Sequence, residues 1–401
     1  MGIGVVYFIR SRKRLGWEDS KLLRHFAIRG ALLVFLNMVQ TYNWSGSRWM
    51  GAESKFATTV LVALGVNFFL SAVVAIASNH AYSAALKKLE TRARRRVASG
   101  RSSIPDIEGA ATRVKLLRIV GLLLLVFALV TLNLLLVPKP TPNGTGFAWW
   151  KYMIYLPGQA SFFFSIYPPL NWLGLSLYGV AFGYIMLGRK RGPMENISLN
   201  VLCGVIFTIA FVVVRVIGGF GNVNPDLLPA PPAGTFLNNP FLTNWQTFFN
   251  TIKYPPDYAY SSLYMAINHF SLAAFFLLPT DVVKDTASEG ESGSTTVAKL
   301  RNCAQYSIGF ITGGPLYDYG RCALFFYIIH LPLYGILGWI TLQISPESWT
   351  VDDGKGGKLL ALEKPGFFSV WIVGLFILWA LCRWYAGFKA RRGPDSVFRF
   401  F

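Results

Sequence analysis

Charged residues are scarce in this chain, and acidic residues are the scarcest of them. Only 14% of its 401 residues are charged, against about 25% in a typical soluble domain. Hydrophobic residues make up 53%, and 19 Asp and Glu stand against 38 Lys and Arg. A soluble protein with so few charged residues would expose much apolar surface to water, whereas a bilayer accommodates apolar surface. The composition therefore excludes an ordinary soluble protein and indicates an integral membrane protein.

Cysteines and familiar catalytic motifs are also scarce. The four cysteines (Cys203, Cys303, Cys322 and Cys382) form no CxxC pair, which argues against a disulfide framework or a zinc site, so we expect no metal. The sequence contains no Walker loop, no GxSxG and no HExxH motif. The apolar start of the chain lacks a basic leading region and a small-residue cleavage site, so no cleavable signal peptide is expected.

Long apolar runs are what the chain has instead. A helix that crosses a bilayer needs about 20 apolar residues, and lipid offers no hydrogen-bond partner to a backbone that is not helical. We therefore expect an all-α, polytopic transmembrane bundle that forms one domain over residues 1–401. The eight predicted spans lie near 26–43, 57–78, 117–137, 170–187, 197–218, 258–279, 322–343 and 367–386.

The basic residues predict the orientation. Alternate segments between the spans carry 27 of the 38 Lys and Arg, whereas the opposite segments carry eight, and Arg29, Arg118 and Arg215 fall inside spans. This bias predicts that the basic segments and the C-terminus are cytoplasmic, in a plasma membrane or an endomembrane. We expect the basic segments to contact anionic lipid and not nucleic acid, because spans flank them. The predicted cytoplasmic segments are 10–25, 79–116, 188–196, 280–321 and 383–401.

The first residues form a short apolar segment. Met1–Ile9 is apolar and ends directly in the basic run Arg10–Arg14. Nine residues of helix cover roughly 14 Å, which is less than half of the hydrocarbon core. Two interpretations are open: an apolar terminus at the membrane interface, or the second half of a span.

Two histidines fall near the middle of the predicted membrane core. His330 follows Arg321 by nine residues, and His269 follows Asp257 by twelve, which places them roughly 13 and 18 Å from opposite membrane edges. Ionisable groups at this depth are candidates for function. Each histidine has two interpretations, a structural hydrogen bond to a neighbouring helix or a place in a shared polar cavity.

Three motifs resemble one protein family. The run Ile252-Lys-Tyr-Pro-Pro-Asp257 is similar to a KYPPS motif at the start of a span, and Tyr319–His330 is similar to FGRxPLFFYxxH. The run Tyr167–Gly183 is similar to YPLLPWLGxxLLGxxLG, and Thr59–Val66 fits more loosely. In order and spacing, these segments resemble the heparan-α-glucosaminide N-acetyltransferase catalytic-domain family in its shorter microbial form, over residues 1 to about 343.

The resemblance implies a membrane acyltransferase. Its members take an acetyl or other acyl group from cytoplasmic acyl-CoA and transfer it across the membrane to an acceptor, often a sugar amine or hydroxyl. Arg321 would lie at the cytoplasmic mouth, where a guanidinium suits a CoA phosphate. His330 would line the path of the pantetheine arm. Further positive charge at the same mouth would come from Arg10, Arg12, Lys13 and Arg14.

One departure from the family pattern bears on catalysis. The family begins with an Arg-bearing span and an external loop that carries a catalytic His, followed by another span. Met1-Gly-Ile-Gly matches the second half of that later span. The resemblance thus favours a partial first span, and it implies that the catalytic His is missing. We transfer that role to neither His269 nor His330, and the catalytic residues stay unassigned.

Two other functions are compatible with the sequence. A transporter or an inactive relative of the enzymes would use mid-membrane histidines in a polar cavity. A membrane anchor would use the basic segment 79–116 to hold a partner. The acceptor molecule is not identified by the sequence.

Overall fold

The computed structural model forms two compact units, Met1–Leu277 and Leu278–Phe401, and each is described by itself. We call them unit 1 and unit 2. That residues 1–401 form one domain stays a prediction. The structure describes residues 1–42, 55–99, 105–136, 148–159, 163–222, 239–253, 256–277, 313–344, 350–352, 358–360 and 364–393.

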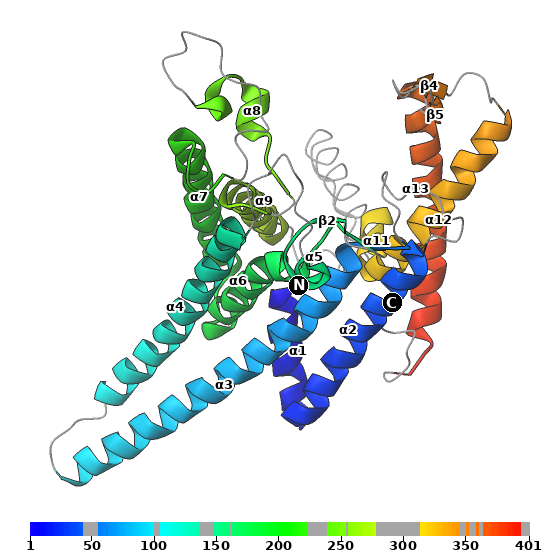
Figure 1. Ribbon diagram of the computed structural model, residues 1–401. Helices are drawn as coiled ribbons and strands as arrows, with labels where there is room; N and C mark the ends of the chain where they lie inside the picture. Colours follow the sequence, from blue (N-terminus) through cyan, green and yellow to red (C-terminus); the bar gives the residue numbers. More distant parts are fainter. Residues whose placement is uncertain are drawn as a thin grey trace, which may run out of the picture. The chain divides into compact units, whose positions relative to one another are not determined.

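Unit 1 is a bundle of long helices with a few very short strands (Figure 1). Its long helices are α1 (Gly2–Arg14), α2 (Asp19–Thr41), α3 (Val60–Ala98), α4 (Pro105–Leu136), α6 (Pro169–Gly188), α7 (Pro193–Ile217) and α9 (Tyr258–Leu277). Its short elements are β1 (Phe56–Thr58), α5 (Trp149–Ile154), β2 (Gly158–Gln159), β3 (Phe163–Ser165), η2 (Pro240–Leu242) and α8 (Trp245–Phe249).

Seven helices in the described part of the chain are long and apolar enough to cross a membrane. They include five helices of unit 1 and two of unit 2. An all-α, multi-pass membrane protein is therefore confirmed. The predicted span 258–279 corresponds to the 20-residue helix α9, which is not one of the seven. Its Tyr, Ser, Asn and His residues lower its mean hydropathy.

Helix α3 corrects one expectation about the basic segment 79–116. The hydropathy pattern predicts a loop there, but α3 continues to Ala98 and α4 begins at Pro105. The 39 residues of α3 extend about 58 Å, far more than a hydrocarbon core of about 30 Å. The apolar run ends near Ser78, but Ala, Leu, Lys, Glu and Arg follow it and are strong helix formers. The helix therefore continues beyond the predicted membrane boundary.

The short first segment is an interior helix of unit 1. Val5, Val6 and Ile9 on α1 are buried in the hydrophobic core. Gly2 allows α1 to lie directly on α6, since a Cβ on Gly2 would overlap with the carbonyl oxygen of Ser176. This packing makes the segment part of the helix bundle. The choice between a terminus at the membrane interface and the second half of a span stays a prediction.

A polar cluster ties the end of α2 to the small sheet of unit 1. Strand β3 pairs in parallel with β1 and antiparallel with β2. The fully buried Asn37 of α2 donates from Nδ2 to the carbonyl oxygen of Ala57 at 2.7 Å, and its Oδ1 accepts from the Thr59 amide at 3.1 Å. The Thr41 hydroxyl donates to the same Ala57 oxygen at 2.9 Å. These side chains hydrogen-bond backbone groups for which lipid offers no partner.

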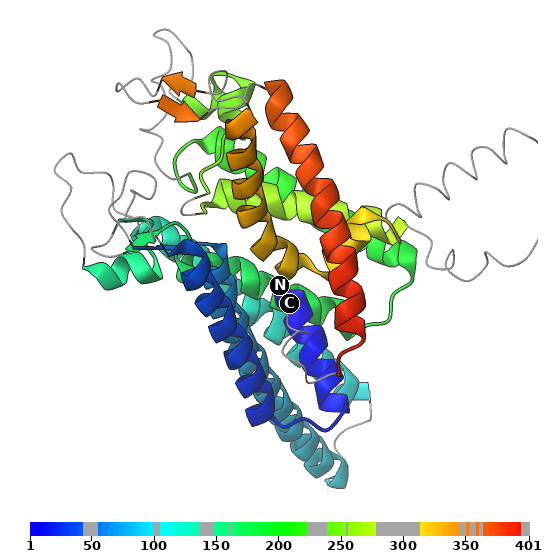
Figure 2. The ribbon, with the colours of Figure 1, turned by 90° about the vertical axis from the view of Figure 1, so that its right-hand side faces the viewer.

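Unit 2 contains two long helices that lie side by side (Figure 2). The Tyr319 hydroxyl donates to the carbonyl oxygen of Leu375 at 2.6 Å, and Trp379 Nε1 donates to Asp318 Oδ2 at 2.9 Å. These bonds connect the short helix α11 (Pro315–Arg321) to the last helix, α13 (Lys364–Ala390). The elements of unit 2 are α11 (Pro315–Arg321), α12 (Ala323–Ile344), β4 (Thr350–Asp352), β5 (Lys358–Leu360) and α13 (Lys364–Ala390).

Candidate functional site

Unit 1 contains a cavity of about 770 Å³ between α1, α3, α4 and α6. It lies at the end of the unit that the charge distribution predicts to be cytoplasmic. Seven cationic side chains line it, and none of its described lining residues is Asp or Glu. We call it the basic cavity. The cations are Arg10, Lys13, Arg14, Lys115, Arg118, Arg189 and Arg191.

The rest of the lining is largely apolar and aromatic. Aliphatic side chains of α1, α4 and α6 form one part of the wall, and the rings of Tyr82 and Tyr184 form another. Ligand sites in proteins commonly have this size and a largely apolar wall, and here seven cations are added to that wall. The concentrated positive charge favours an anion, and the apolar wall favours a ligand with an uncharged part. The aliphatic residues are Val6, Ile9, Ile119, Ile185 and Leu187.

Arg118 is the most firmly held cation in the lining. Its Nε donates to Ser78 Oγ at 2.8 Å, and its Nη2 donates to Asn79 Oδ1 at 2.6 Å. Its guanidinium carbon lies 3.3 Å from the centre of the Tyr184 ring. The Tyr184 hydroxyl in turn donates to the carbonyl oxygen of Ala75 at 3.0 Å. A cation held in this way is pre-organised, so little side-chain entropy is lost when an anion binds.

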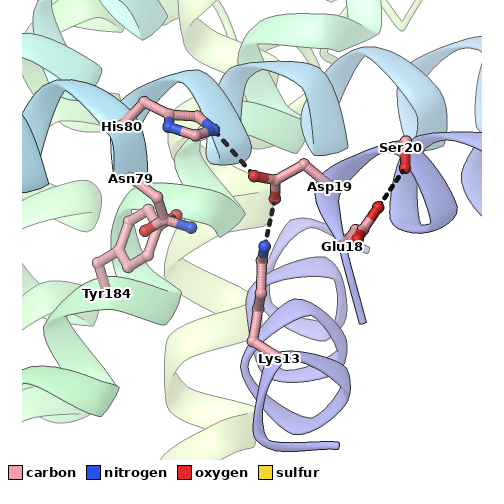
Figure 3. A network of polar contacts seen from close by, with 7 residues as sticks. All are labelled: Lys13, Glu18, Asp19, Ser20, Asn79, His80 and Tyr184. Atoms are coloured by element: carbon pink, nitrogen blue, oxygen red, sulfur yellow. Dashed lines mark hydrogen bonds and ion pairs between the residues drawn. The ribbon is translucent and has the colours of Figure 1, made fainter. Parts of the chain in front are cut away.

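Lys13 of the basic cavity belongs to a charged cluster at the junction of α1, α2 and α3 (Figure 3). Its Nζ lies 2.8 Å from Asp19 Oδ1, and His80 Nε2 lies 2.9 Å from Asp19 Oδ2. Figure 3 also shows Glu18 of the same segment, whose carboxylate accepts from the Ser20 hydroxyl at 3.4 Å. Asp19 is therefore positioned to compete with an anionic ligand for Lys13.

The structure brings three of the four predicted cations of the first segment together. Arg10, Lys13 and Arg14 line the basic cavity, but Arg12 does not. The Arg12 guanidinium lies 5.1 Å from the centre of the Phe8 ring and 5.0 Å from that of Trp17. A residue two positions from Arg10 points to a different face of a helix.

Arg321 and His330 lie in unit 2. Arg321 lines a cavity of about 420 Å³ together with Lys389, whose Nζ donates to the Arg321 carbonyl oxygen at 3.4 Å. His330 Nδ1 lies 2.6 Å from the carbonyl oxygen of Tyr327, one turn earlier in α12. Arg321 ends α11, and α12 begins at Ala323, so no single straight helix joins Arg321 to His330. Their roles with CoA stay predictions.

His269 lies in the interior of unit 1 and has two side-chain partners. Its Nε2 lies 2.6 Å from the Tyr178 hydroxyl, and its Nδ1 lies 3.0 Å from Asn200 Oδ1. Only 2% of its surface is exposed. Because His330 belongs to the other unit, the expectation of a cavity shared by the two histidines stays a prediction. Within the described residues, no group of three His, Cys, Asp or Glu side chains could hold a metal ion.

The sequence does not single out four cations of the basic cavity as site residues: Lys115, Arg118, Arg189 and Arg191. Three of them lie in predicted cytoplasmic segments, where they indicate only the orientation, and Arg118 lies in a predicted span. The spacing of Lys115 and Arg118 is the available signal, because residues three apart share a helix face. The sequence does not indicate that this face of α4 lines the same cavity as α1 and α6.

A comparison with models of known protein families and with curated proteins gives no match for this chain. A function is therefore inferred from the basic cavity and from the three motifs. Of these motifs, Tyr167–Gly183 covers the start and most of α6, whose last turn lines the basic cavity.

Proposed function

We propose that this chain is a membrane-embedded acyltransferase that binds cytoplasmic acyl-CoA, such as acetyl-CoA, in the basic cavity. It would transfer the acyl group to an acceptor across the membrane, with a sugar as the expected class. In this proposal α9 is the eighth complete span, α1 is a partial span, and the basic segments face the cytoplasm and its anionic lipid. The observation that carries the proposal is the convergence of seven cations and an apolar wall in one cavity.

The chemistry of CoA matches this lining in three respects. CoA carries its phosphates and its adenine at one end, and an uncharged pantetheine arm at the other. Guanidinium groups bind phosphates through paired, charge-assisted hydrogen bonds. The ring of Tyr82 suits stacking with a planar base, whereas one face of the Tyr184 ring is already covered by Arg118. The aliphatic wall suits the pantetheine arm.

The proposal assigns donor binding to this chain, and it assigns no residue as the catalytic base. His269 is buried with both nitrogens in hydrogen bonds, so this role is not assigned to it. Donor binding and acyl transfer are therefore tested separately. Acyl transfer needs a positioned base, whereas donor binding does not.

Calorimetry with the purified chain in lipid nanodiscs tests donor binding. We expect CoA to bind at least tenfold more tightly than pantetheine, because pantetheine lacks the phosphates. We also expect the CoA affinity to fall as salt is raised, since exposed charges are screened. Equal affinity for CoA and pantetheine would contradict the proposal. Displacement of CoA by anionic lipid vesicles, with no preference for CoA over lipid phosphate, would favour a lipid-binding role.

Asp19→Asn is expected to raise the affinity for CoA by roughly two- to fivefold. Without the Asp19 carboxylate, the Lys13 ammonium is available to bind a phosphate of CoA. The matched control is Glu18→Gln, which removes the same charge from the neighbouring residue but no contact with Lys13. An equal gain in both variants would mean that only the net charge matters. Calorimetry at low salt measures both.

A further inference from the structure

The cavity of about 420 Å³ in unit 2 lies where α12 begins and α13 ends. Both helices are long and apolar enough to cross a membrane, so this point is at the level of a membrane surface. Near it, Trp384 of α13 is exposed and stacks on Phe388, and aromatic side chains of this kind are common at membrane interfaces. We call it the interfacial cavity. Its described lining residues are Arg321, Cys322, Ala386, Lys389 and Ala390.

Two cations line the interfacial cavity, and no Asp or Glu is among its described lining residues. Lys389 Nζ donates to the carbonyl oxygen of Arg321 at 3.4 Å, which keeps the two cations close together. The Arg321 guanidinium carbon lies 5.2 Å from the centre of the Tyr317 ring, and within the described chain no carboxylate forms an ion pair with Arg321. The nearby Asp318 instead accepts a hydrogen bond from Trp379 Nε1 at 2.9 Å. The cavity therefore favours an anion.

The rest of the described wall is made of small side chains. Ala386 and Ala390 present only methyl groups, and Cys322 Sγ donates to the carbonyl oxygen of Cys382 at 3.5 Å. The space beside the two cations is thus available to a ligand, and its volume is within the range of small-molecule sites. Because the cavity lies at the level of a membrane surface, the anions most concentrated around it are the phosphates of anionic lipids.

We propose that the interfacial cavity binds the phosphate of an anionic phospholipid, such as phosphatidylglycerol. The Arg321 guanidinium donates charge-assisted hydrogen bonds to the phosphate oxygens, and the Lys389 ammonium adds a second positive charge. A zwitterionic lipid such as phosphatidylcholine carries the same phosphate, but the two cations repel its trimethylammonium group. The proposal does not depend on acyl-CoA binding. It gives Arg321 a lipid ligand in place of the CoA phosphate that the family resemblance implies.

Photolabelling of the purified chain in nanodiscs tests the site, with phosphatidylglycerol that bears a diazirine near its glycerol as the probe. We expect saturable labelling of peptides from the start of α12 and the end of α13. Unlabelled phosphatidylglycerol should compete about five- to thirtyfold better than phosphatidylcholine with the same acyl chains, since each basic side chain at a membrane surface strengthens the attraction about fivefold. Equal competition by the two lipids would overturn the proposal. Competition by inorganic phosphate at the same concentration as the lipid would also overturn it, because the ligand would then be a free phosphate.

Three variants locate the binding. The double variant Arg321→Met/Lys389→Met removes both cations and is expected to abolish the preference for phosphatidylglycerol. Ala390→Trp leaves both cations in place but fills the cavity from an exposed position, and it is expected to abolish saturable labelling. The matched control is Arg391→Met/Arg392→Met, which removes the same charge just beyond the end of α13 from two exposed residues that do not line the cavity. The control is expected to change the preference by less than about twofold.

Saturable labelling that persists in folded Ala390→Trp contradicts the proposal, even if the double variant of Arg321 and Lys389 fails to fold. An equal loss in the control variant contradicts it as well, because diffuse charge would then hold the lipid. CoA affinity is expected to be unchanged in Arg321→Met/Lys389→Met. If that variant loses CoA affinity and keeps the lipid preference, Arg321 binds CoA and the proposal is wrong. If the unaltered chain binds no CoA but is labelled as expected, only the proposed function fails.

Discussion

Arg118→Met is expected to weaken CoA binding about 10- to 100-fold, because hydrogen bonds to charged groups contribute about 1.5–3 kcal/mol each. The methionine retains most of the apolar volume against Tyr184 but has no guanidinium. Arg118 is already held by Ser78 and Asn79, so its contribution is not reduced by the entropy of ordering a free side chain. Calorimetry in nanodiscs measures the change.

Arg24→Met is the matched control for this prediction. Arg24 is an exposed residue of α2 that does not line the basic cavity. The control removes the same charge from the predicted cytoplasmic part of unit 1, and we expect it to change CoA affinity by less than about threefold. If both variants lose affinity equally, CoA is bound by the diffuse charge of the surface and not by a built site. If neither does, CoA binding by the basic cavity is wrong.

The helices are the most predictable part of this molecule. The predicted spans 170–187 and 197–218 correspond to Pro169–Gly188 and Pro193–Ile217, within a few residues at each end. Lipid forces an apolar run of about 20 residues to be helical, so hydropathy alone predicts such elements. Hydropathy cannot predict where a helix ends outside the membrane, which is why it does not reveal the continuation of α3 to Ala98.

Only some of the cations that line the basic cavity could be predicted from the sequence. The run Arg10–Arg14 is conspicuous because its cations are adjacent in the sequence, and three of them line the basic cavity. Arg189 and Arg191 are far from Arg10 in the sequence and become its neighbours only because α1 packs on α6. That contact depends on small residues, which are common where helices meet in membrane proteins. A single sequence does not show which small residues meet, and here Gly2 meets Gly179, and Gly183 lies against Val6.

Close helix contacts of this kind also determine stability, and the contact between α2 and α3 is the sharpest example. A Cβ on Gly65 would lie 2.5 Å from the carbonyl oxygen of Gly30, and a Cβ on Gly30 would lie 2.6 Å from that of Gly65. Both oxygens are backbone atoms, so no side-chain rotation relieves the overlap. The two helices would have to move apart along an extensive contact that includes the buried Phe26.

Gly65→Ala is therefore expected to destabilise the protein by about 1–3 kcal/mol, the usual cost of overpacking. Gly121→Ala is the matched control, because Gly121 is also in a helix interior but a Cβ added there would meet no atom within 4 Å. There the substitution is expected to stabilise by about 0.5–1 kcal/mol, since alanine loses less backbone entropy than glycine. Thermal unfolding in detergent should shift in opposite directions for the two variants. A shift in the same direction would mean that helix propensity, and not the distance between α2 and α3, decides the effect at Gly65.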